Sequence, residues 1–581
     1  MDKPLIYFFV SFILGIIIFI FYSFSSFLAF LFMTFFILLL VRGISYKEVL
    51  INIIIVIFSF YNAYSYFNVN LPKDNDVVKI RVYNKKGYKI IGIINDKRVY
   101  IKNLKGGDIG DIIYAKGDFK EDIQYDKGII GEFSLNNEIE RKQDLYSKII
   151  GYRSFLDEEF QSIFGVEDGI LLSNLCFGDN SSIDIETKEK LKSLGVIHVI
   201  SVSGFHIALV YKLVSTILGG NIALIITFFY GIFTGGKSST WRAFIMIFLS
   251  KASLKLYRNY DGVSALSLAG IILLSIKPYY LMDVGFCLSF LATLGIVLFQ
   301  KTINNKLYKL PSFLREPISI TMSAQVFTFP YMIFTFGSFN LGFLIGNLFL
   351  VPLFTLLIIL GNCAAIFLNT FLIKYIKYFV EIIMQILNGG IYILHSMSLK
   401  TSYLSYLEGC IVIAIYICYL LVKKGNKKYK YLPLFLCTLI IFEYYKPYTE
   451  IKVLDVLGKE AYIISYKKRN VLLTNSNKVG EDLIKGYNID EVKDIGTYPL
   501  KFNIKDKNNT NVEIINIGNG ERKVSITVLP MKENRIFKFM NYRGKKNYDI
   551  ILLKPKKQVG FRRAYETNSV IITEFNIYNL K

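Results

Sequence analysis

Long uninterrupted blocks of apolar residues constrain this chain more than any other feature. Residues 5–22 and 27–41 form the first two blocks, 49–66 forms a third, and others recur between 195 and 445. A helix needs about 20 apolar residues to cross the hydrocarbon core of a bilayer. The composition agrees, since 53% of the 581 residues are hydrophobic and 19% are charged. The sequence therefore predicts a polytopic α-helical membrane protein and excludes a water-soluble globular enzyme.

Polar segments divide these blocks into five predicted regions. They are three N-terminal transmembrane helices (1–71), a β-rich extracytoplasmic domain (72–142), an amphipathic helical segment (143–193), a helical transmembrane domain (194–448) and a C-terminal α/β domain (449–581). The loops containing Arg42, Lys47 and Lys423–Lys428 are basic and belong in the cytoplasm by the positive-inside rule, which places both polar domains outside. Lys3 is the only basic residue before the first block, and no small-residue cleavage site follows, so we expect an uncleaved first helix in the cell membrane.

Region 72–142 alternates short β-rich runs with turn signals, and the predicted runs are Val77–Tyr83, Lys89–Ile94, Arg98–Asn103 and Ile112–Lys116. This pattern suits a small barrel of the OB type. Bases can stack on tyrosines while lysines contact phosphates, and a net charge of +23 favours a polyanionic partner. An ordinary solvated domain with core tyrosines explains the same residues equally well. The candidate nucleic-acid contacts are Lys85, Lys86, Tyr88 and Lys102, within a wider cluster that includes Tyr83 and Arg98.

The amphipathic segment 143–193 carries phenylalanines on one face, among them Phe155, Phe160 and Phe164. Such a pattern predicts a helix that lies along the membrane surface or plugs the outer side of the helical domain. The six cysteines follow neither a disulfide nor a metal-ligand spacing, so we interpret them as buried structural thiols and predict no cofactor.

The stretch 194–210 places polar side chains inside an otherwise apolar span. They are His198, Ser201, Ser203, Gly204 and His206. Polar groups in hydrocarbon are costly unless they meet one another, the backbone or water, so they should face the bundle interior or an aqueous groove. Three interpretations compete: hydrogen bonding between packed helices, nucleophilic catalysis by Ser203 with His206 one turn away, and the polar lining of a translocation path.

A second stretch, Gly231–Ser238, matches the nucleotide-binding P-loop pattern literally. A real P-loop follows a buried strand of a soluble sheet, whereas residues 223–230 form an apolar membrane span. We interpret the match as chance and assign any ATP hydrolysis to a cytoplasmic partner.

Several motifs together resemble the competence domain of the ComEC family. The similar elements, in order, are Asn174–Asp179, the stretch around His198 to His206, Tyr230–Gly235 with Trp241–Met246, Val284–Ile296, and Ala324–Pro330 with Phe336–Phe339 and Gly346–Pro352. The resemblance implies an inner-membrane channel that passes single-stranded DNA into the cytoplasm during natural transformation. It adds Arg242, Gln325 and Asn347 to the polar residues expected along the path.

The C-terminal region begins with Ile451–Ile464, which resembles the opening strands of the metallo-β-lactamase-like domain of many family members. In that domain a histidine-rich set binds two metal ions that activate water. Since no histidine follows His395 here, we predict a truncated remnant that holds no metal and has no nuclease activity. Its 25 Lys and Arg against 15 Asp and Glu predict a basic surface for DNA, with Lys554, Lys556 and Lys557 as candidate contacts.

The predicted function is thus a channel without chemistry of its own. An intramembrane serine hydrolase using Ser203 and His206, and a small-solute or lipid transporter on the same scaffold, remain alternatives. The channel hypothesis requires other partners besides single-stranded DNA and membrane lipid. These are a helicase-like ATPase in the cytoplasm, an extracytoplasmic DNA receptor, and a separate nuclease that degrades the second strand.

Overall fold

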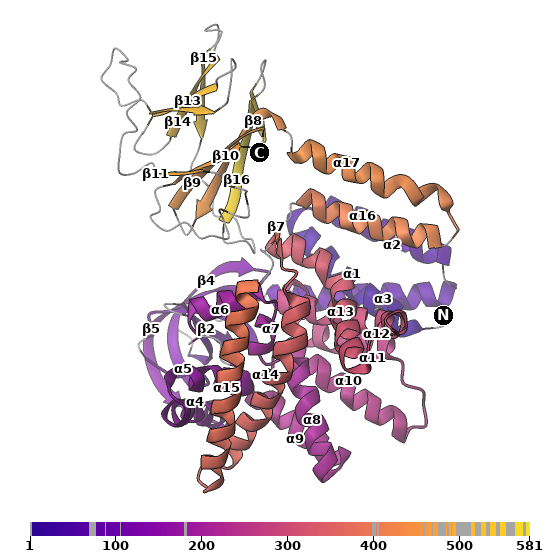
Figure 1. The fold of residues 1–581 in the computed structure, drawn as a ribbon, viewed down its shortest axis with the longest axis vertical. Helices are drawn as coiled ribbons and strands as arrows, with labels where there is room; N and C mark the ends of the chain where they lie inside the picture. Colours follow the sequence, from indigo (N-terminus) through magenta and orange to yellow (C-terminus); the bar gives the residue numbers. More distant parts are fainter. Residues whose placement is uncertain are drawn as a thin grey trace. The chain divides into compact units, whose positions relative to one another are not determined.

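The computed structural model describes residues 3–43, 45–68, 77–86, 89–104, 106–178, 183–397, 402–403, 406–423, 425–444, 446–456, 459–467, 469–474, single positions between 484 and 489, 491–494, and the strands within 513–580. The chain divides into two compact units. The first comprises residues 1–328 and 340–400, and the second comprises 329–339 and 401–581. We describe each unit by itself (Figure 1).

Three helices open the first unit: α1 (Pro4–Phe24), α2 (Ser26–Gly43) and α3 (Tyr46–Phe67). Their bounds lie within three residues of the predicted blocks. α1 packs closely against α3, because Gly15 leaves room for Ser59 and the Ser11 hydroxyl donates to Asn52 Oδ1 at 2.7 Å. This hydrogen bond pairs two polar groups that would otherwise have no partner in the hydrocarbon core of the membrane.

The β-rich region forms a closed five-stranded barrel in the order β1-β2-β3-β5-β4. Its strands are β1 (Val78–Lys86), β2 (Lys89–Ile94), β3 (Lys97–Lys102), β4 (Ile112–Gln124) and β5 (Ile129–Lys142). Neighbouring strands are antiparallel except β3 and β5, which are parallel. The fully buried Ile80, Ile94 and Ile113 fill the interior. The four predicted runs are β1 to β4, and their closure with β5 supports the barrel; its OB-type assignment stays a prediction.

The rest of the first unit is helical. Its elements are α4 (Leu145–Phe164), α5 (Val166–Phe177), α6 (Ile185–Ser193), α7 (Ile197–Ile200), α8 (Gly204–Leu218), α9 (Gly220–Phe233), α10 (Ser238–Lys255), α11 (Gly262–Ile276), η1 (Pro278–Met282), α12 (Val284–Lys306), most of α13 (Ser312–Phe336), α14 (Phe343–Ile366) and α15 (Leu372–Met397). Within the described residues, six helices are long and apolar enough to cross a membrane: α1, α3, α12, α13, α14 and α15. Shorter apolar helices include α8, α9 and α11.

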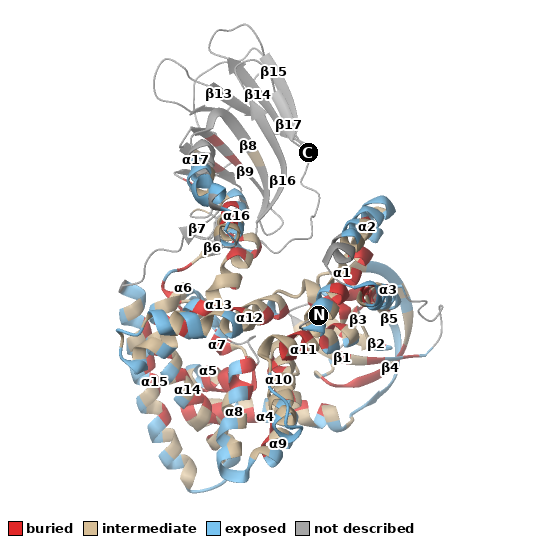
Figure 2. Ribbon diagram, turned by 90° about the vertical axis from the view of Figure 1, so that its right-hand side faces the viewer, coloured by how far each residue is buried: buried red, intermediate tan, exposed pale blue. Residues whose placement is uncertain are grey.

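The amphipathic segment packs into the helical part of the first unit, and its placement along a membrane surface or as an outer plug stays a prediction. Residues of α4 and α5 enter a core that they share with α14 and α15, and Figure 2 shows α5 largely red. Phe160 and Phe164, four residues apart, face this core at 0% and 7% exposure, while Phe155 is 44% exposed because it lies on another side of the helix. The core extends along α5, where Leu172 and neighbours are buried on every side.

The described part of the second unit contains two further α-helices, the two-stranded pair β6-β7 and two larger sheets. The elements are β6 (Ser338–Phe339), β7 (Ser402–Tyr403), α16 (Tyr406–Lys423), η2 (Lys427–Tyr431), α17 (Leu432–Tyr444), β8 (Lys446–Val456), β9 (Lys459–Lys467), β10 (Arg469–Thr474), β11 (Glu491–Asp494), β12 (Glu513–Ile517), β13 (Val524–Leu529), β14 (Arg535–Asn541), β15 (Asn547–Leu552), β16 (Ala564–Ile572) and β17 (Ile577–Leu580). One sheet runs β11-β10-β9-β8-β16-β17 and the other β12-β13-β14-β15. The metallo-β-lactamase-like character of this region stays a prediction.

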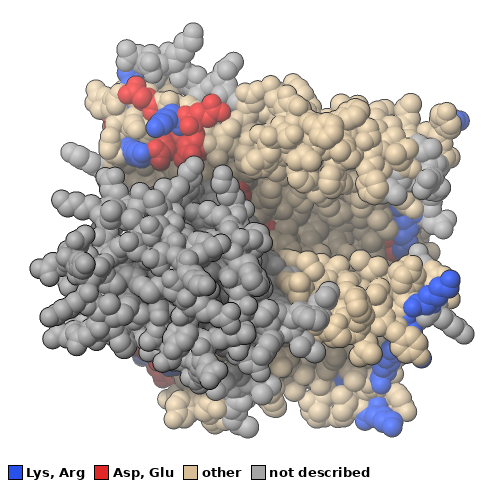
Figure 3. Space-filling model, turned by 90° about the horizontal axis from the view of Figure 1, so that it is seen from above, with Lys and Arg blue, Asp and Glu red and all other residues tan. Residues whose placement is uncertain are grey.

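Apolar side chains cover much of the helical exterior. Exposed residues of α15, for example, include Tyr378 and Phe379, while Val380 and Met384 on the same helix are buried. In the view from above, broad uncharged areas separate Lys and Arg side chains that gather near the margins (Figure 3). Such surfaces suit contact with lipid tails, in agreement with a multi-pass membrane protein.

Candidate functional site

The polar stretch 194–210 is a helix break rather than part of one continuous span. α7 ends at Ile200, the backbone is extended at Ser201 and Ser203, and α8 begins at Gly204. Ser203 caps α8: its Oγ accepts from the Phe205 N–H at 3.3 Å. A serine at this position satisfies backbone donors that a helix N-terminus leaves unpaired. The local sequence thus folds as two helices joined by a short unwound segment.

His206 completes the cap from inside the helix. Its side chain is 0% exposed, and Nδ1 accepts the Ser203 N–H at 3.2 Å while also lying 3.2 Å from Ser203 Oγ. A neutral imidazole that accepts at Nδ1 carries its proton on Nε2. In the described part of the chain, no carboxylate contacts the ring. A catalytic dyad would need the same Nδ1 lone pair as a base, so the geometry favours a capping role over nucleophilic catalysis.

Lys237 reaches the break from the start of α10. Its Nζ donates to Ser201 Oγ at 2.7 Å and to the Gly178 carbonyl at 3.3 Å. It lies in the stretch that matches the P-loop pattern, but here that stretch connects α9 to α10, so a helix rather than a strand precedes it. Lys237 is not among the predicted path residues, because the P-loop match that contains it is interpreted as chance. A cation inside an apolar helical domain was the signal that could have identified it.

Arg242 reaches the same break from the next turn of α10. Its Nη1 donates to the Ser289 carbonyl of α12 at 2.9 Å, and its Nε is buried without a hydrogen-bond partner. A Cβ placed on Gly204 would lie 2.4 Å from Arg242 Nη2 and 3.0 Å from the Ala243 Cβ. Gly204 is therefore required for the close crossing of α8 over α10, which positions the guanidinium against the break.

The structure brings together Ser201, Ser203, Gly204, His206 and Arg242 among the predicted path residues. Among the described residues, the other three make no hydrogen bond to these five. His198 is exposed on α7, with Nδ1 3.0 Å from the Gly195 carbonyl. Gln325 Oε1 accepts from the Thr328 hydroxyl at 3.0 Å within α13. Asn347 follows Gly346 in α14, and its buried Oδ1 has no hydrogen-bond partner.

The predicted outer contacts with DNA are partly ion-paired. Lys85 lies 3.9 Å from Asp108, and Lys102 contacts Glu132. The side chains of Lys86 and Tyr88, and residues Lys554, Lys556 and Lys557, lie outside the described residues. Arg98 and Tyr83, which the sequence grouped with them, face the helical part of the first unit instead.

In the part of the chain that the structure describes, no group of three or more His, Cys, Asp or Glu side chains could hold a metal ion. The cysteines are not uniformly buried as expected. Cys176 and Cys418 are buried, Cys287 and Cys363 are half-buried, and Cys410 and Cys437 are exposed. The exposed pair lies on α16 and α17, whose apolar surfaces are available to lipid.

Comparison with known proteins identifies relatives of the helical part. Residues 175–424 match the family model described as Competence protein. The chain is 24% identical over 230 residues to ComE operon protein 3 of Bacillus subtilis (strain 168), a match that covers 38% of this chain and 29% of that protein. It is 31% identical over 158 residues to an uncharacterized protein of Aquifex aeolicus (strain VF5), covering 26% and 38% respectively. The chain thus spans less than two fifths of either relative's length, and no solved structure matches it.

Proposed function

Because this chain belongs to the ComEC family of competence proteins, we propose that it conducts single-stranded DNA across the cell membrane during DNA uptake. The observation that carries the proposal is the helix break at Ser201–Ser203, which Lys237 and Arg242 approach from α10. This break lies within the matched residues 175–424. Unwound backbone at membrane depth is tolerated where it is buried in protein or borders water.

The chemistry of the break suits passage rather than tight binding. Conduction requires sites that attract an ion yet release it. Lys237 and Arg242 offer positive charge to phosphates, while hydroxyl and carbonyl groups of neighbouring residues already occupy part of their donor capacity. A phosphate would exchange with these neutral partners instead of displacing a strong ion pair from Arg242. His198, Gln325 and Asn347 extend the proposed path as further polar positions.

The barrel and the C-terminal region are proposed as outer, extracytoplasmic binding surfaces. The strand order β1-β2-β3-β5-β4 supports an OB-like role in gripping a single strand. In this proposal Lys85 and Lys102 exchange Asp108 and Glu132 for phosphates. The surplus of basic residues in 449–581 supports salt-dependent DNA binding there without cleavage.

The proposed path supplies no energy for directional movement. We assign that energy to a helicase-like ATPase on the cytoplasmic side. An extracytoplasmic receptor would deliver the DNA, and a separate nuclease would degrade the second strand. The serine-hydrolase alternative is less well supported, because Ser203 and His206 are both engaged in capping α8. A transporter of small solutes or lipids predicts normal DNA uptake when the gene is deleted.

The deciding experiment measures labelled DNA that becomes nuclease-resistant inside cells with and without the gene. We expect protection to disappear in the deletion strain and to return with the wild-type gene. Arg242→Gln should restore it only in part and Arg242→Lys more fully, because the second variant keeps the charge. Arg258→Gln, at an exposed arginine after the same helix, is the matched control and should restore it completely. Equal protection in deletion and wild-type strains would refute the channel.

A further inference from the structure

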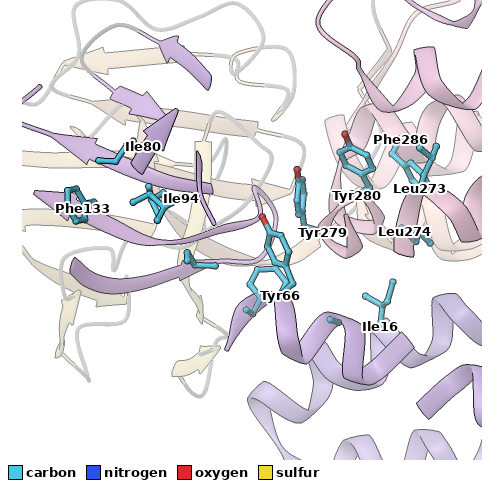
Figure 4. Close-up of a cluster of buried hydrophobic side chains, with 14 of the residues drawn as sticks. Ile16, Tyr66, Ile80, Ile94, Phe133, Leu273, Leu274, Tyr279, Tyr280 and Phe286 are labelled. Atoms are coloured by element: carbon cyan, nitrogen blue, oxygen red, sulfur yellow. The ribbon is translucent and has the colours of Figure 1, made fainter. Parts of the chain in front are cut away.

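The barrel is seated on the helical part of the first unit through a seam of aromatic and basic side chains (Figure 4). The Arg98 guanidinium from β3 lies between two rings, 4.6 Å from the Tyr83 centroid and 4.7 Å from the Tyr279 centroid. Its Nη1 also donates to the Lys127 carbonyl at 3.2 Å. Tyr279 belongs to η1, so this one side chain joins the barrel to the connection between α11 and α12.

The seam lies at the ends of apolar helices. Tyr66, in the last turn of the candidate span α3, donates its hydroxyl to the Gly128 carbonyl of the β4–β5 turn at 2.9 Å. Lys277 terminates α11, and the candidate span α12 begins at Val284. Tyrosine, lysine and arginine at the ends of membrane helices are typical of the level of the lipid headgroups. The seam therefore lies where a membrane surface would meet the protein.

Several donors in the seam lack acceptors. In the described part of the chain, Lys277 Nζ makes no hydrogen bond or ion pair, and it lies 5.5 Å from the Tyr280 ring centroid. The hydroxyls of Tyr279 and Tyr280 likewise have no hydrogen-bond partner among described residues, although these residues are only 4% and 7% exposed. Figure 4 shows the two hydroxyls pointing the same way. None of these three polar atoms is among the buried atoms without a partner, so each can donate to an acceptor from outside the protein. The positive charges of Lys277 and Arg98 beside them favour an anionic acceptor.

We propose that this seam binds the phosphate headgroup of an anionic phospholipid, held by Lys277 and the Tyr280 hydroxyl beside Arg98. A phosphate has enough acceptor oxygens for an ammonium and two phenols at once. Its charge would offset the repulsion between the two cations. The position at the helix ends favours a lipid over a DNA backbone, because the acyl chains can lie along the apolar helices. The site is independent of the proposed conduction of DNA.

The protonation state of Lys277 gives the site a pH dependence. Burial, together with the positive charge of Arg98, lowers the pKa of Lys277 to about 8, while Asp96 in the β2–β3 turn opposes the shift. Tyr279 and Tyr280 face it from η1, and burial raises the pKa of both phenols, so they remain protonated donors. Lys277 is charged below its pKa and neutral above it. Headgroup binding is therefore strong near pH 7 and weakens as the pH rises past 8, with the bound phosphate moving the transition upward.

The test compares thermal unfolding of the delipidated full-length chain with added phosphatidylglycerol or phosphatidylcholine. For the wild type at pH 7, we expect phosphatidylglycerol to raise the Tm above the value in phosphatidylcholine. Lys277→Gln should remove this difference, and Lys277→Arg should keep it and preserve it at pH 9.5. Lys255→Gln, at an exposed lysine in the last turn of α10, is the matched control and should retain the full difference. Because each variant is its own reference, a change in basal stability does not affect the result.

Three results would overturn the proposal. The first is a wild-type Tm that does not distinguish the two lipids. The second is a lipid difference that Lys277→Gln leaves intact. The third is loss of the wild-type difference when a short oligodeoxythymidylate is added, which would assign the seam to a nucleic-acid phosphate instead of a lipid.

Discussion

Replacing Arg98 by glutamine should loosen the barrel from the helical part of the first unit without unfolding either. The substitution removes two cation–π contacts, with Tyr83 and Tyr279, each worth about 1 kcal/mol at a partly buried site. It also replaces charge-assisted hydrogen bonds to Tyr83 and to the Lys127 carbonyl with at most one neutral bond, a loss of about 1–2 kcal/mol. Tyr83 and Lys127 belong to the barrel itself, so only the contact with Tyr279 opposes undocking. The expected docking cost is about 1 kcal/mol, or roughly a fivefold shift toward the undocked state.

Hydrogen–deuterium exchange of the full-length chain measures this shift locally. Exchange should accelerate by about fivefold in η1 and in the β4–β5 turn at Gly128, the two segments that Arg98 and Tyr66 hold together. Strand β1, whose Ile80 and Val82 are fully buried inside the barrel, should exchange as in the wild type. Arg98→Lys should have an intermediate effect, because it keeps the charge but loses the planar stacking.

The control is Arg141→Gln, since Arg141 is a barrel arginine that pairs with Glu138 on its own strand. It should leave exchange in η1 unchanged. Unaltered exchange in η1 for Arg98→Gln would refute the docking role. Equal acceleration throughout the barrel would also refute it, by showing that Arg98 supports the barrel fold and not its attachment.

Three further outcomes follow from the local geometry. Gly346→Ala would place a Cβ 2.2 Å from a main-chain oxygen and should destabilise the chain by about 1–3 kcal/mol in thermal unfolding, whereas Gly389→Ala, with open space around it, should not lower the Tm. Gly128→Ala combines a positive φ of 65° with a Cβ only 2.3 Å from the Tyr279 ring, and should accelerate exchange in η1 as Arg98→Gln does. Burial favours a higher pKa for Asp144, the N-cap of α4, but hydrogen bonds from Ser147 hold the pKa below its usual value. A depressed carboxyl pKa stabilises the fold above the unfolded pKa near 4 and loses that effect as the pH falls through the folded pKa. Lowering the pH from 5 to 3 should therefore destabilise the wild type more than Asp144→Asn, as measured by unfolding at each pH.

The membrane-spanning elements could be predicted because their signal is long and local. Blocks of apolar residues gave α1, α2 and α3 to within three residues. β5 had no predicted counterpart, since its second half, Asn136–Lys142, is polar and has low strand propensity by itself. Its pairing with β4 supplies the order that the local sequence lacks.

Interactions between distant parts of the chain could not be predicted. Clustered Lys, Arg and Tyr indicate either base stacking or internal cation–π contacts, and the sequence does not distinguish them. Arg98 makes the internal kind, because its second ring comes from Tyr279, far along the chain. Likewise, the spacing of Ser203 and His206 fits a cap, a dyad or a polar lining. Only the hydrogen bond from the Ser203 N–H to Nδ1 identifies the cap.

α12 connects the helix break to the seam under the barrel. At Ser289 its carbonyl accepts from Arg242, the arginine held against Gly204. Within one turn of that carbonyl, Phe286 stacks on Phe290 with centroids 4.2 Å apart and reaches Tyr280, 6.0 Å away. A packed helix moves as a unit rather than deforming residue by residue. The same helix therefore positions Arg242 at the break and supports the attachment of the barrel. If α12 moved far enough to release the Arg242 guanidinium, it would also disturb the aromatic stack beneath the barrel.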